Sequence, residues 1–195
     1  MTRLAMTSFF VEIVEVVDSP KELVYEVIKA KLACELNDKW HSRLPYIHWS
    51  NVVRNTAYVC FGAKDENGEY VAVGIWSSPV AQNRFKYGKQ MLELRRMAIS
   101  DGCPKNTATH MLRFMRRWIV ANKPTIAMLI SYQDTEVHLG TIYKADNWVE
   151  ASLSQGLAWT TTTRKRNKEQ SLAPKIRWEY KLKDYQEVDK TEDSL

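Results

Sequence analysis

Apolar residues near the start of the chain predict a strand followed by a helix. The segment Phe9–Val17 is rich in Val, Ile and Phe, which is typical of a buried strand, and Asp18, Ser19 and Pro20 close it. After Pro20, which suits the first turn of a helix, apolar residues recur at spacings of four, three and four. These positions are Leu23, Val27, Ala30 and Cys34. The pattern predicts an amphipathic helix that begins at Pro20.

The middle of the chain predicts a long loop, a hairpin and a further strand. Lys39–Asn55 shows no regular period, and loops of this length are often functional. Two β-rich runs, Thr56–Gly62 and Tyr70–Trp76, flank the pair Asn67-Gly68, which tolerates the positive φ of a tight hairpin turn. The polar residues 77–89 predict a second loop, and residues 91–99 predict a strand.

The second half of the chain alternates helices and strands. Thr107–Asn122 carries apolar residues on one helical face and arginines on another. Ile126–Tyr132, Trp148–Ala151 and Ile176–Leu182 predict strands, and Glu136–Asp146 predicts a short helix. The resulting order is β-α-β-β-β-α-β-α-β-β. It predicts an α/β (α+β) fold, with a mixed sheet flanked by helices.

Composition predicts one folded domain. The 195 residues are 45% apolar and 26% charged, with few Gly and Pro, so we expect a single domain over residues 1–183. Residues 184–195 carry a net charge of −4 and predict a flexible acidic tail. No apolar run approaches the ~18 residues of a membrane span, and the N-terminus lacks the apolar core of a signal peptide. Three widely spaced cysteines predict neither a disulfide framework nor a zinc site, so a cytoplasmic location is expected.

The net charge of +5 comes from two basic blocks. Residues 1–94 are neutral, residues 95–123 and 164–183 carry +6 each, and residues 124–163 carry −3. A basic block is either a solvated helix face or an anion-binding surface, and both alternatives remain open at this point.

One short segment resembles a part of the GNAT N-acetyltransferase superfamily. Thr141–Trp148 is similar to the short helix after the fifth strand of that fold, where a tyrosine precedes a Gly-Phe pair. The resemblance implies that Tyr143 acts as a general acid toward the departing coenzyme A thiolate. The alternative is that Tyr143 only packs against Trp148.

Several segments together resemble the Mom-type phage DNA-modification proteins, a divergent branch of the GNAT fold. They are Trp40–Pro45, Leu92–Ala98 and Leu129–Asp134, together with His138, Gly140, Ile142, Tyr143, Asn147 and Trp148. The match extends over roughly residues 39–150. It implies a transferase that converts adenine in DNA to an N6-methylcarbamoyl derivative. Such a bacteriophage protein would shield DNA from restriction in the cytoplasm of the infected host.

The resemblance implies four catalytic candidates. His41 and Ser42 fall on the family's His-containing loop, Asp134 on the acidic residue at the end of the fifth strand, and Tyr143 on the tyrosine described above. Adenine N6 is a poor nucleophile, so a base must remove its proton, and Asp134 or His41 is expected to do so. Alternatively, His41, Asp134 and His138 bind a metal such as iron, or the histidines are structural.

The cofactor loop departs from the superfamily's Q/R-x-x-G-x-G/A turn. Lys105 keeps the basic first position, but Ala108 and His110 replace the glycine and the small residue. The fold implies acetyl-CoA or a related acyl donor, with its pyrophosphate at the start of a helix. The candidate contacts are Lys105, Asn106, Thr107 and Thr109, and the main-chain groups of Met97, Ala98 and Ile99 for the pantetheine arm. Asn106 is alternatively an ordinary N-cap.

A base-modifying enzyme must also hold DNA phosphates and receive an extruded base. The candidates are Arg164, Lys165, Arg166 and Lys168 for the phosphates, and Trp40, Trp49 and Trp76 for stacking. The strand position of Trp76 favours a core role. Two other functions fit the residues: an N-acyltransferase that acts on a small amine, an aminated nucleotide or a protein, and a non-enzymatic DNA-binding protein on a GNAT scaffold.

Overall fold

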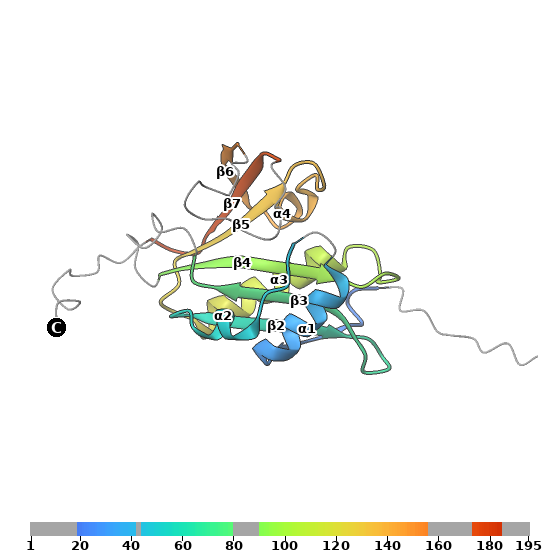
Figure 1. Ribbon diagram of the computed structural model, residues 1–195. Coiled ribbons are helices and arrows are strands. Elements are labelled where there is room, and N and C mark those ends of the chain that lie inside the picture. Colours follow the sequence, from blue (N-terminus) through green and yellow to red (C-terminus); the bar gives the residue numbers. More distant parts are fainter. Residues whose placement is uncertain (1–18, 42–43, 80–89, 156–172, 185–195) are drawn as a thin grey trace, which may run out of the picture.

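The computed structural model describes residues 19–41, 44–79, 90–155 and 173–184, which form a mixed sheet flanked by helices (Figure 1). Its described strands are β1 (Val24–Ile28), β2 (Tyr58–Lys64), β3 (Tyr70–Ser77), β4 (Met91–Ile99), β5 (Met128–Asp134), β6 (Val149–Ser154) and β7 (Lys175–Lys181). They pair in the order β1-β2-β3-β4-β5-β7-β6. The described helices are α1 (Ala30–Trp40), α2 (Trp49–Val53), α3 (Thr107–Asn122) and α4 (Thr141–Ala145). The predicted fold class is therefore confirmed.

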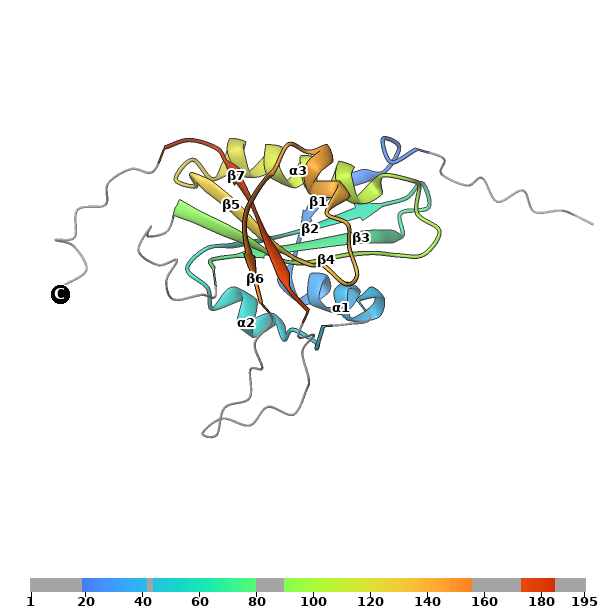
Figure 2. The same ribbon diagram turned by 90° about the horizontal axis from the view of Figure 1, so that it is seen from above.

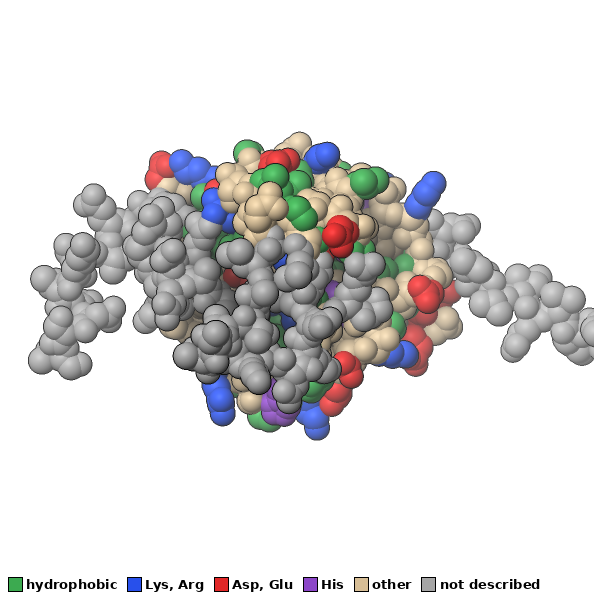
Figure 3. Space-filling model, turned by 45° about the horizontal axis from the view of Figure 1, so that its top comes forward, with side chains coloured by type: hydrophobic (Ala, Val, Ile, Leu, Met, Phe, Trp, Pro, Cys, Tyr) green, Lys and Arg blue, Asp and Glu red, His purple; other side chains and the backbone are tan. Residues whose placement is uncertain are grey.

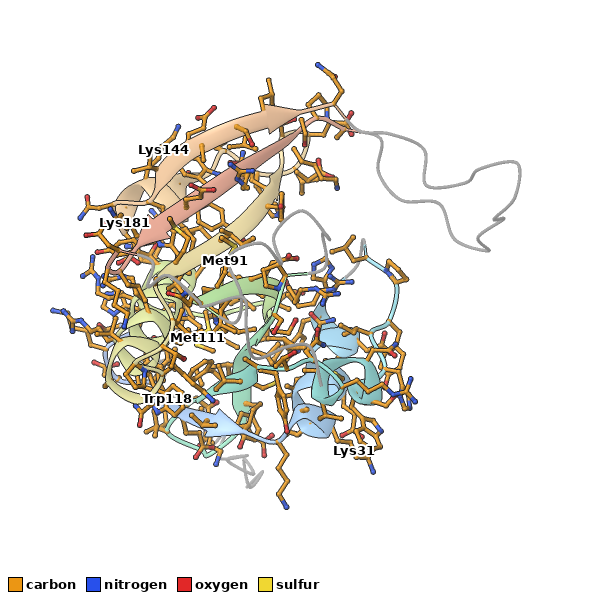
Figure 4. The ribbon with its side chains drawn as sticks, turned by 90° about the vertical axis from the view of Figure 1, so that its left-hand side faces the viewer. Lys31, Met91, Met111, Trp118, Lys144 and Lys181 are labelled. Carbon is orange, nitrogen blue, oxygen red and sulfur yellow. The ribbon has the colours of Figure 1, made fainter. Side chains whose placement is uncertain are left out.

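The two faces of the sheet carry different helices. Figures 2 and 4 show α3 on one face and α1 with α2 on the other. The larger core forms under α3, where Met111 and Met115 pack against strand residues such as Phe61 and Trp76. A smaller core under α1 and α2 includes Cys34, together with Val73 and other strand residues. The alternation of side chains along each strand thus divides the apolar residues between two helical layers.

The prediction for the first helix is wrong. Residues 24–28 form the edge strand β1, which pairs antiparallel with β2, and α1 begins only at Ala30. The spacing that predicted one helix combines residues of this strand with residues of α1. Val24, Tyr25, Val27 and Ile28 are β-branched or aromatic and suit a strand, so pairing with β2 decided the conformation. The strand expected at Phe9–Val17 lies outside the described residues.

Two further boundaries differ from the prediction. Within Lys39–Asn55, α1 extends to Trp40 and residues 49–53 form the short helix α2, whose first turn is capped by the ring of His48. The helix expected over Glu136–Asp146 is reduced to α4. The hairpin between β2 and β3 is confirmed, although only Gly68 of the predicted turn pair has a positive φ, of 79°.

The parallel pair β4 and β5 defines the position of the site. Their ladder joins only residues 91–94 to residues 128–131. Beyond Leu94 and Ser131 the strands diverge, and β5 rises away from β4 in Figure 1. The carboxyl ends of parallel strands in such sheets are common ligand positions.

No helix in the parts of the chain that the structure describes is long and apolar enough to cross a membrane.

Candidate functional site

A cavity of about 480 Å³ opens where β4 and β5 separate. Its wall includes Arg96 and Met97 of β4, Ser131 of β5, and Tyr143 of α4. Residues from both helical layers also reach it: Ala108 lies in the first turn of α3, and His41 directly follows α1. The cavity is thus accessible to groups from both faces of the sheet.

Tyr143 is the most enclosed titratable group at this cavity. Its hydroxyl oxygen lies 2.7 Å from Ser131 Oγ, and its ring stacks on Trp178 with centroids 5.3 Å apart. The Tyr143 ring also contacts the edge of Trp148, with centroids 5.6 Å apart, so the packing that was the alternative to a catalytic role is present. Burial raises the pKa of Tyr143, and the hydrogen bond between Tyr143 and Ser131 opposes this effect. The phenol therefore keeps its proton at neutral pH.

The turn before α4 holds Tyr143 in place. Gln133, at the end of β5, accepts a 2.7 Å hydrogen bond from the Trp178 indole and donates one to the main-chain oxygen of His138. Gly140 has a φ of 69°, and a Cβ there would lie only 2.5 Å from Gln133 Oε1. The glycine is therefore required both by its backbone conformation and by the close approach of Gln133.

A buried ion-pair network joins α4 to α3. Asp146, whose side chain is 1% exposed, accepts hydrogen bonds of 2.8 and 2.9 Å from Arg116, while Arg113 lies 3.4 Å away. The Trp148 indole donates a further bond of 3.1 Å to the carboxylate. Burial alone would raise the pKa of Asp146, but these hydrogen bonds and charges outweigh it and lower the pKa. The network fixes the end of α4 and with it the position of Tyr143.

His41 enters the cavity from the end of α1. Its ring accepts a long hydrogen bond of 3.4 Å from the main-chain N–H of Leu44. Burial, and after it the charge of Arg96 and the neighbouring His138, lower the pKa of His41. At neutral pH the imidazole is uncharged and therefore able to take up a proton.

Asp134 does not belong to the cavity wall. Its carboxylate accepts the Glu136 N–H at 3.1 Å, and lies 3.9 Å from Lys175 Nζ on β7. Of the catalytic and metal candidates from the sequence, His41, His138 and Tyr143 line this cavity, whereas Asp134 does not. The predicted catalytic role of Asp134 stays a prediction, and the residue's visible contacts are those of a turn.

The structure does not assemble the suggested iron site. Within the described ranges, no three His, Cys, Asp or Glu side chains come together as metal ligands. His41 and His138 share the cavity, while Asp134 points its carboxylate to the turn after β5. The iron expectation therefore has no support from these residues.

The proposed donor side of the cavity combines an open strand edge with a helix start. The main chain of Met97, Ala98 and Ile99 lies beyond the end of the β4–β5 ladder, so its β5-facing edge pairs with no strand among the described residues. In the first turn of α3, Thr107 and His110 donate back to main-chain oxygens, whereas no such bond is seen for Ala108 and Thr109 within the described chain. These features fit the amides and phosphates of a coenzyme A derivative.

The candidate cofactor-binding residues of the loop before α3 differ in whether their polar groups are free to bind a ligand. Asn106 occupies the N-cap position of α3, as the alternative expected, but it is not an ordinary cap, because its φ of 68° is left-handed and its side chain makes no cap hydrogen bond. Thr107 is buried, and its hydroxyl donates to Pro104 at 2.7 Å, so it is already occupied. Lys105 is exposed beside this turn, while Thr109 is partly buried in it. The cofactor contacts of these residues stay predictions.

Three of the seven cations in the first basic block form internal ion pairs. Arg113 and Arg116 bind Asp146, and Arg95 lies 3.5 Å from Glu93. On the face shown in Figure 3, Lys and Arg side chains alternate with Asp and Glu ones rather than forming one patch. The second block's DNA candidates, Arg164, Lys165, Arg166 and Lys168, lie outside the described residues, as does Ser42.

The three tryptophan candidates occupy different environments. Trp40 lines the cavity, whereas Trp49 is 39% exposed on α2, away from it. Trp76 is fully buried and donates to Met115 Sδ at 3.1 Å, in agreement with the core interpretation. Only Trp40 is therefore placed to meet a base in the cavity.

Three polar wall residues were not singled out from the sequence. Ser131 and Gln133 are polar positions at the end of an otherwise apolar strand, and this interruption was the available signal. Arg96 was counted only as part of a basic block, because its orientation into a cavity depends on the separation of β4 and β5.

The fold and the split between β4 and β5 define the class: this is a GNAT-fold protein. Three solved structures with 10–13% sequence identity to this chain share the fold. A GNAT-family acetyltransferase from Streptococcus pneumoniae is 10% identical, with 83% of this chain and 100% of that chain covered and a TM-score of 0.58. Spermidine N-acetyltransferase from Vibrio cholerae, in complex with CoA and spermine, is 10% identical over 83% and 96%, with a TM-score of 0.58. IAA acetyltransferase from Bacillus cereus is 13% identical over 82% and 99%, with a TM-score of 0.52.

A sequence comparison identifies the family within that class. Residues 23–192 match the model of the Mom protein family, and the chain belongs to this family. The resemblance found in the sequence is thereby confirmed. Among proteins with curated functions, none matches the chain in sequence.

Proposed function

We propose that this protein transfers an acyl-derived group from a coenzyme A thioester to the exocyclic amine of adenine in DNA. The observation that carries the proposal is the buried Tyr143–Ser131 pair on the same cavity as a neutral His41, in a chain of the Mom family. The step itself yields an N6-acyladenine and free coenzyme A. The N6-methylcarbamoyl product that the family implies contains a nitrogen atom that the acetyl group of acetyl-CoA lacks, so that product requires a thioester that already carries the methylcarbamoyl group. Protection of phage DNA from restriction belongs to the same proposal.

The donor supplies an activated carbonyl group when it is bound. The open edge of β4 is suited to pantetheine amides, and the N–H groups of Ala108 and Thr109 are suited to its phosphates. The cavity between these two features is large enough for a thioester to meet an acceptor. The Vibrio cholerae spermidine N-acetyltransferase, which shares the fold, binds CoA, and this supports a related donor here.

His41 and Tyr143 divide the proton transfers in this scheme. His41 takes the proton that the N6 amine loses as the nitrogen–carbon bond forms, and Tyr143 gives its proton to sulfur as the carbon–sulfur bond breaks. The two directions of pKa shift suit these roles, since the imidazole is neutral and the phenol is protonated at neutral pH. Ser131 orients the phenol through the 2.7 Å hydrogen bond.

The direct test is nucleoside mass spectrometry. The purified chain is incubated with acetyl-CoA and an adenine-containing oligonucleotide, and DNA from cells that express the chain is digested in parallel. A modified deoxyadenosine is expected, and the mass of the added group identifies it. Formation of an acetylated polyamine or peptide amine instead, with unmodified DNA, would support the alternative acyltransferase and reject the proposal.

A matched pair of variants tests which group is the base. His41→Gln should lower the rate about 10²- to 10⁴-fold, the usual contribution of a general base. Asp134→Asn keeps an oxygen that accepts the Glu136 N–H and should retain most of the activity. Loss of activity in Asp134→Asn with a functional His41→Gln would reverse the assignment.

DNA binding itself is proposed to involve Arg164, Lys165 and Arg166. Replacing these three by Gln should reduce the slope of log affinity against log salt concentration by about two to three, because each phosphate contact contributes about 0.7 to 0.9. An unchanged slope would place the DNA contacts elsewhere.

A further inference from the structure

Arg96 lies on the cavity wall and forms no ion pair with another described residue. Its Nη1 atom donates to the main-chain oxygen of Arg95 at 2.7 Å, and its Nε atom is buried without a hydrogen-bond partner. Among the residues with described positions, no carboxylate lies within ion-pair distance of it. The Arg96 guanidinium therefore has an unsatisfied hydrogen-bond donor and no ion-pair partner among the described residues.

The neighbouring arginines show the contrast. Arg95 reaches Ser77 Oγ at 3.1 Å and Glu93 at 3.5 Å, and Arg116 forms a bidentate pair with Asp146. Burial, and after it the charge of Arg95, lower the pKa of Arg96 to about 10, and the negative charge of Glu93, which is shared with Arg95, opposes this only in part. Arg96 is therefore still charged at neutral pH, in surroundings that disfavour the charge, and an anion in the cavity would offset that cost.

The position of Arg96 separates it from the donor side. Side chains alternate along β4: Met97 and Ile99 pack with the core under α3, while Ala98 packs with the core under α1. Arg96 shares the α1 face with Ala98, in agreement with its electrostatic effects on Cys34 of α1 and on His41. In Figure 4 the helices of these two faces, α1 and α3, lie on opposite sides of the sheet.

This placement indicates which anion Arg96 meets. The N–H groups suited to the donor's phosphates are at the start of α3, on the opposite face. The α1 side of the cavity, where Trp40 and His41 lie, is left for the acceptor. A nucleotide drawn out of a DNA strand brings its flanking phosphates with it, and the planar guanidinium fork matches phosphate oxygens.

We propose that Arg96 binds a backbone phosphate next to the target nucleotide and so positions the base against His41 and Tyr143. This inference rests on the proposed function, since it presupposes a nucleic-acid acceptor. In this inference Arg96 binds the acceptor, whereas the phosphates of the donor are bound by the N–H groups at the start of α3.

The test combines a protein variant with a chemical change in the DNA. Arg96→Met removes the positive charge from the protein. An oligonucleotide in which neutral methylphosphonates flank one adenine removes the negative charge of the phosphates that Arg96 is proposed to bind. Arg96→Met should raise KM for the normal oligonucleotide about 10- to 100-fold, the value of a charged hydrogen bond, and leave the Kd for acetyl-CoA unchanged. The neutral linkages should impair the wild type to a similar extent and impair Arg96→Met little further.

Exposed Arg117 on α3 provides the control for a lost positive charge. Arg117→Met should leave KM and the response to methylphosphonates unchanged. If the neutral linkages impair Arg96→Met as strongly as the wild type, or if Arg96→Met weakens acetyl-CoA instead, the inference is wrong while the proposed function stands. If the wild type neither binds nor modifies the oligonucleotide, the proposed function fails and the inference fails with it.

Stability provides an independent readout. An unbalanced cation kept for binding should make Arg96→Met at least as stable as the wild type in the absence of DNA. A fall in Tm, or failure of the variant to fold, would show that Arg96 supports the fold and would contradict the inference. Arg96→Lys keeps the charge without the planar fork and should recover only part of the DNA affinity.

Discussion

Replacing Tyr143 by Phe removes one oxygen atom from the most enclosed part of the cavity. The ring retains its stacking on Trp178 at 5.3 Å and its edge contact with Trp148 at 5.6 Å. What is lost is the 2.7 Å hydrogen bond to Ser131, whose side chain is itself buried. The substitution therefore separates the chemical role of Tyr143 from its packing role.

The stability cost follows from the partner that remains. Ser131 Oγ loses its hydrogen bond to Tyr143, which costs about 1 to 3 kcal/mol. Removing both hydroxyls, with Ser131→Ala added to Tyr143→Phe, should recover part of that cost because no buried group loses its partner. The free energy of unfolding in urea measures both values.

The catalytic cost is expected to be much larger. If Tyr143 protonates the leaving thiolate, Tyr143→Phe should lower kcat by about 10²- to 10⁴-fold under conditions where the variant remains folded. Ser131→Ala keeps the phenol and breaks the same hydrogen bond, so it should lower kcat less. Single-turnover rates of DNA modification measure the effect. A kcat for Tyr143→Phe within threefold of that for Ser131→Ala would refute the proton-donor role and leave only packing.

Three further predictions concern the network, the base and the core. Asp146→Ala leaves Arg116 without its bidentate partner and should lower the free energy of unfolding in urea by about 3 kcal/mol. This value is at the lower end of the range for breaking a buried ion pair, because the arginine reaches solvent. A decrease below 1 kcal/mol would contradict the structural role of the pair. The pKa of His41 is lowered, so kcat/KM should be constant at neutral pH and fall only below pH 6.5 as the imidazole is protonated. The Arg96→Met variant removes one of the charges that lower this pKa, so its acid limb should move to higher pH, and an unmoved limb would exclude His41 as the titrating group. In Gly74→Ala, the added Cβ would lie 2.3 Å from Met115 Sδ, and the strain should cost about 1 to 3 kcal/mol in the same unfolding measurement, while wild-type stability would show that Met115 moves freely.

Strong periodicity made much of the fold predictable. The residues of α3 were predicted from the apolar face that packs on the sheet, and the hairpin from β2 to β3 was predicted from two β-rich runs around Gly68. The first helix was wrong because a helical spacing can arise by chance across a strand and a helix. Pairing of residues 24–28 with β2 is a long-range interaction that local periodicity does not contain.

For the site, the sequence by itself determined the residue types and their order: His41 after α1, polar residues at the end of β5, and Tyr143 in the short segment that follows. Their proximity depends on the tertiary structure, because the β4–β5 ladder ends at Leu94 and Ser131 and opens a cavity between distant segments. The same separation placed Asp134 outside the cavity wall and Arg96 on it. The orientation of a charged side chain and the presence of a counter-charge beside it depend on which residues pack around it. A net charge read along the chain therefore did not show that Arg116 is paired while Arg96 lacks a partner carboxylate among the described residues.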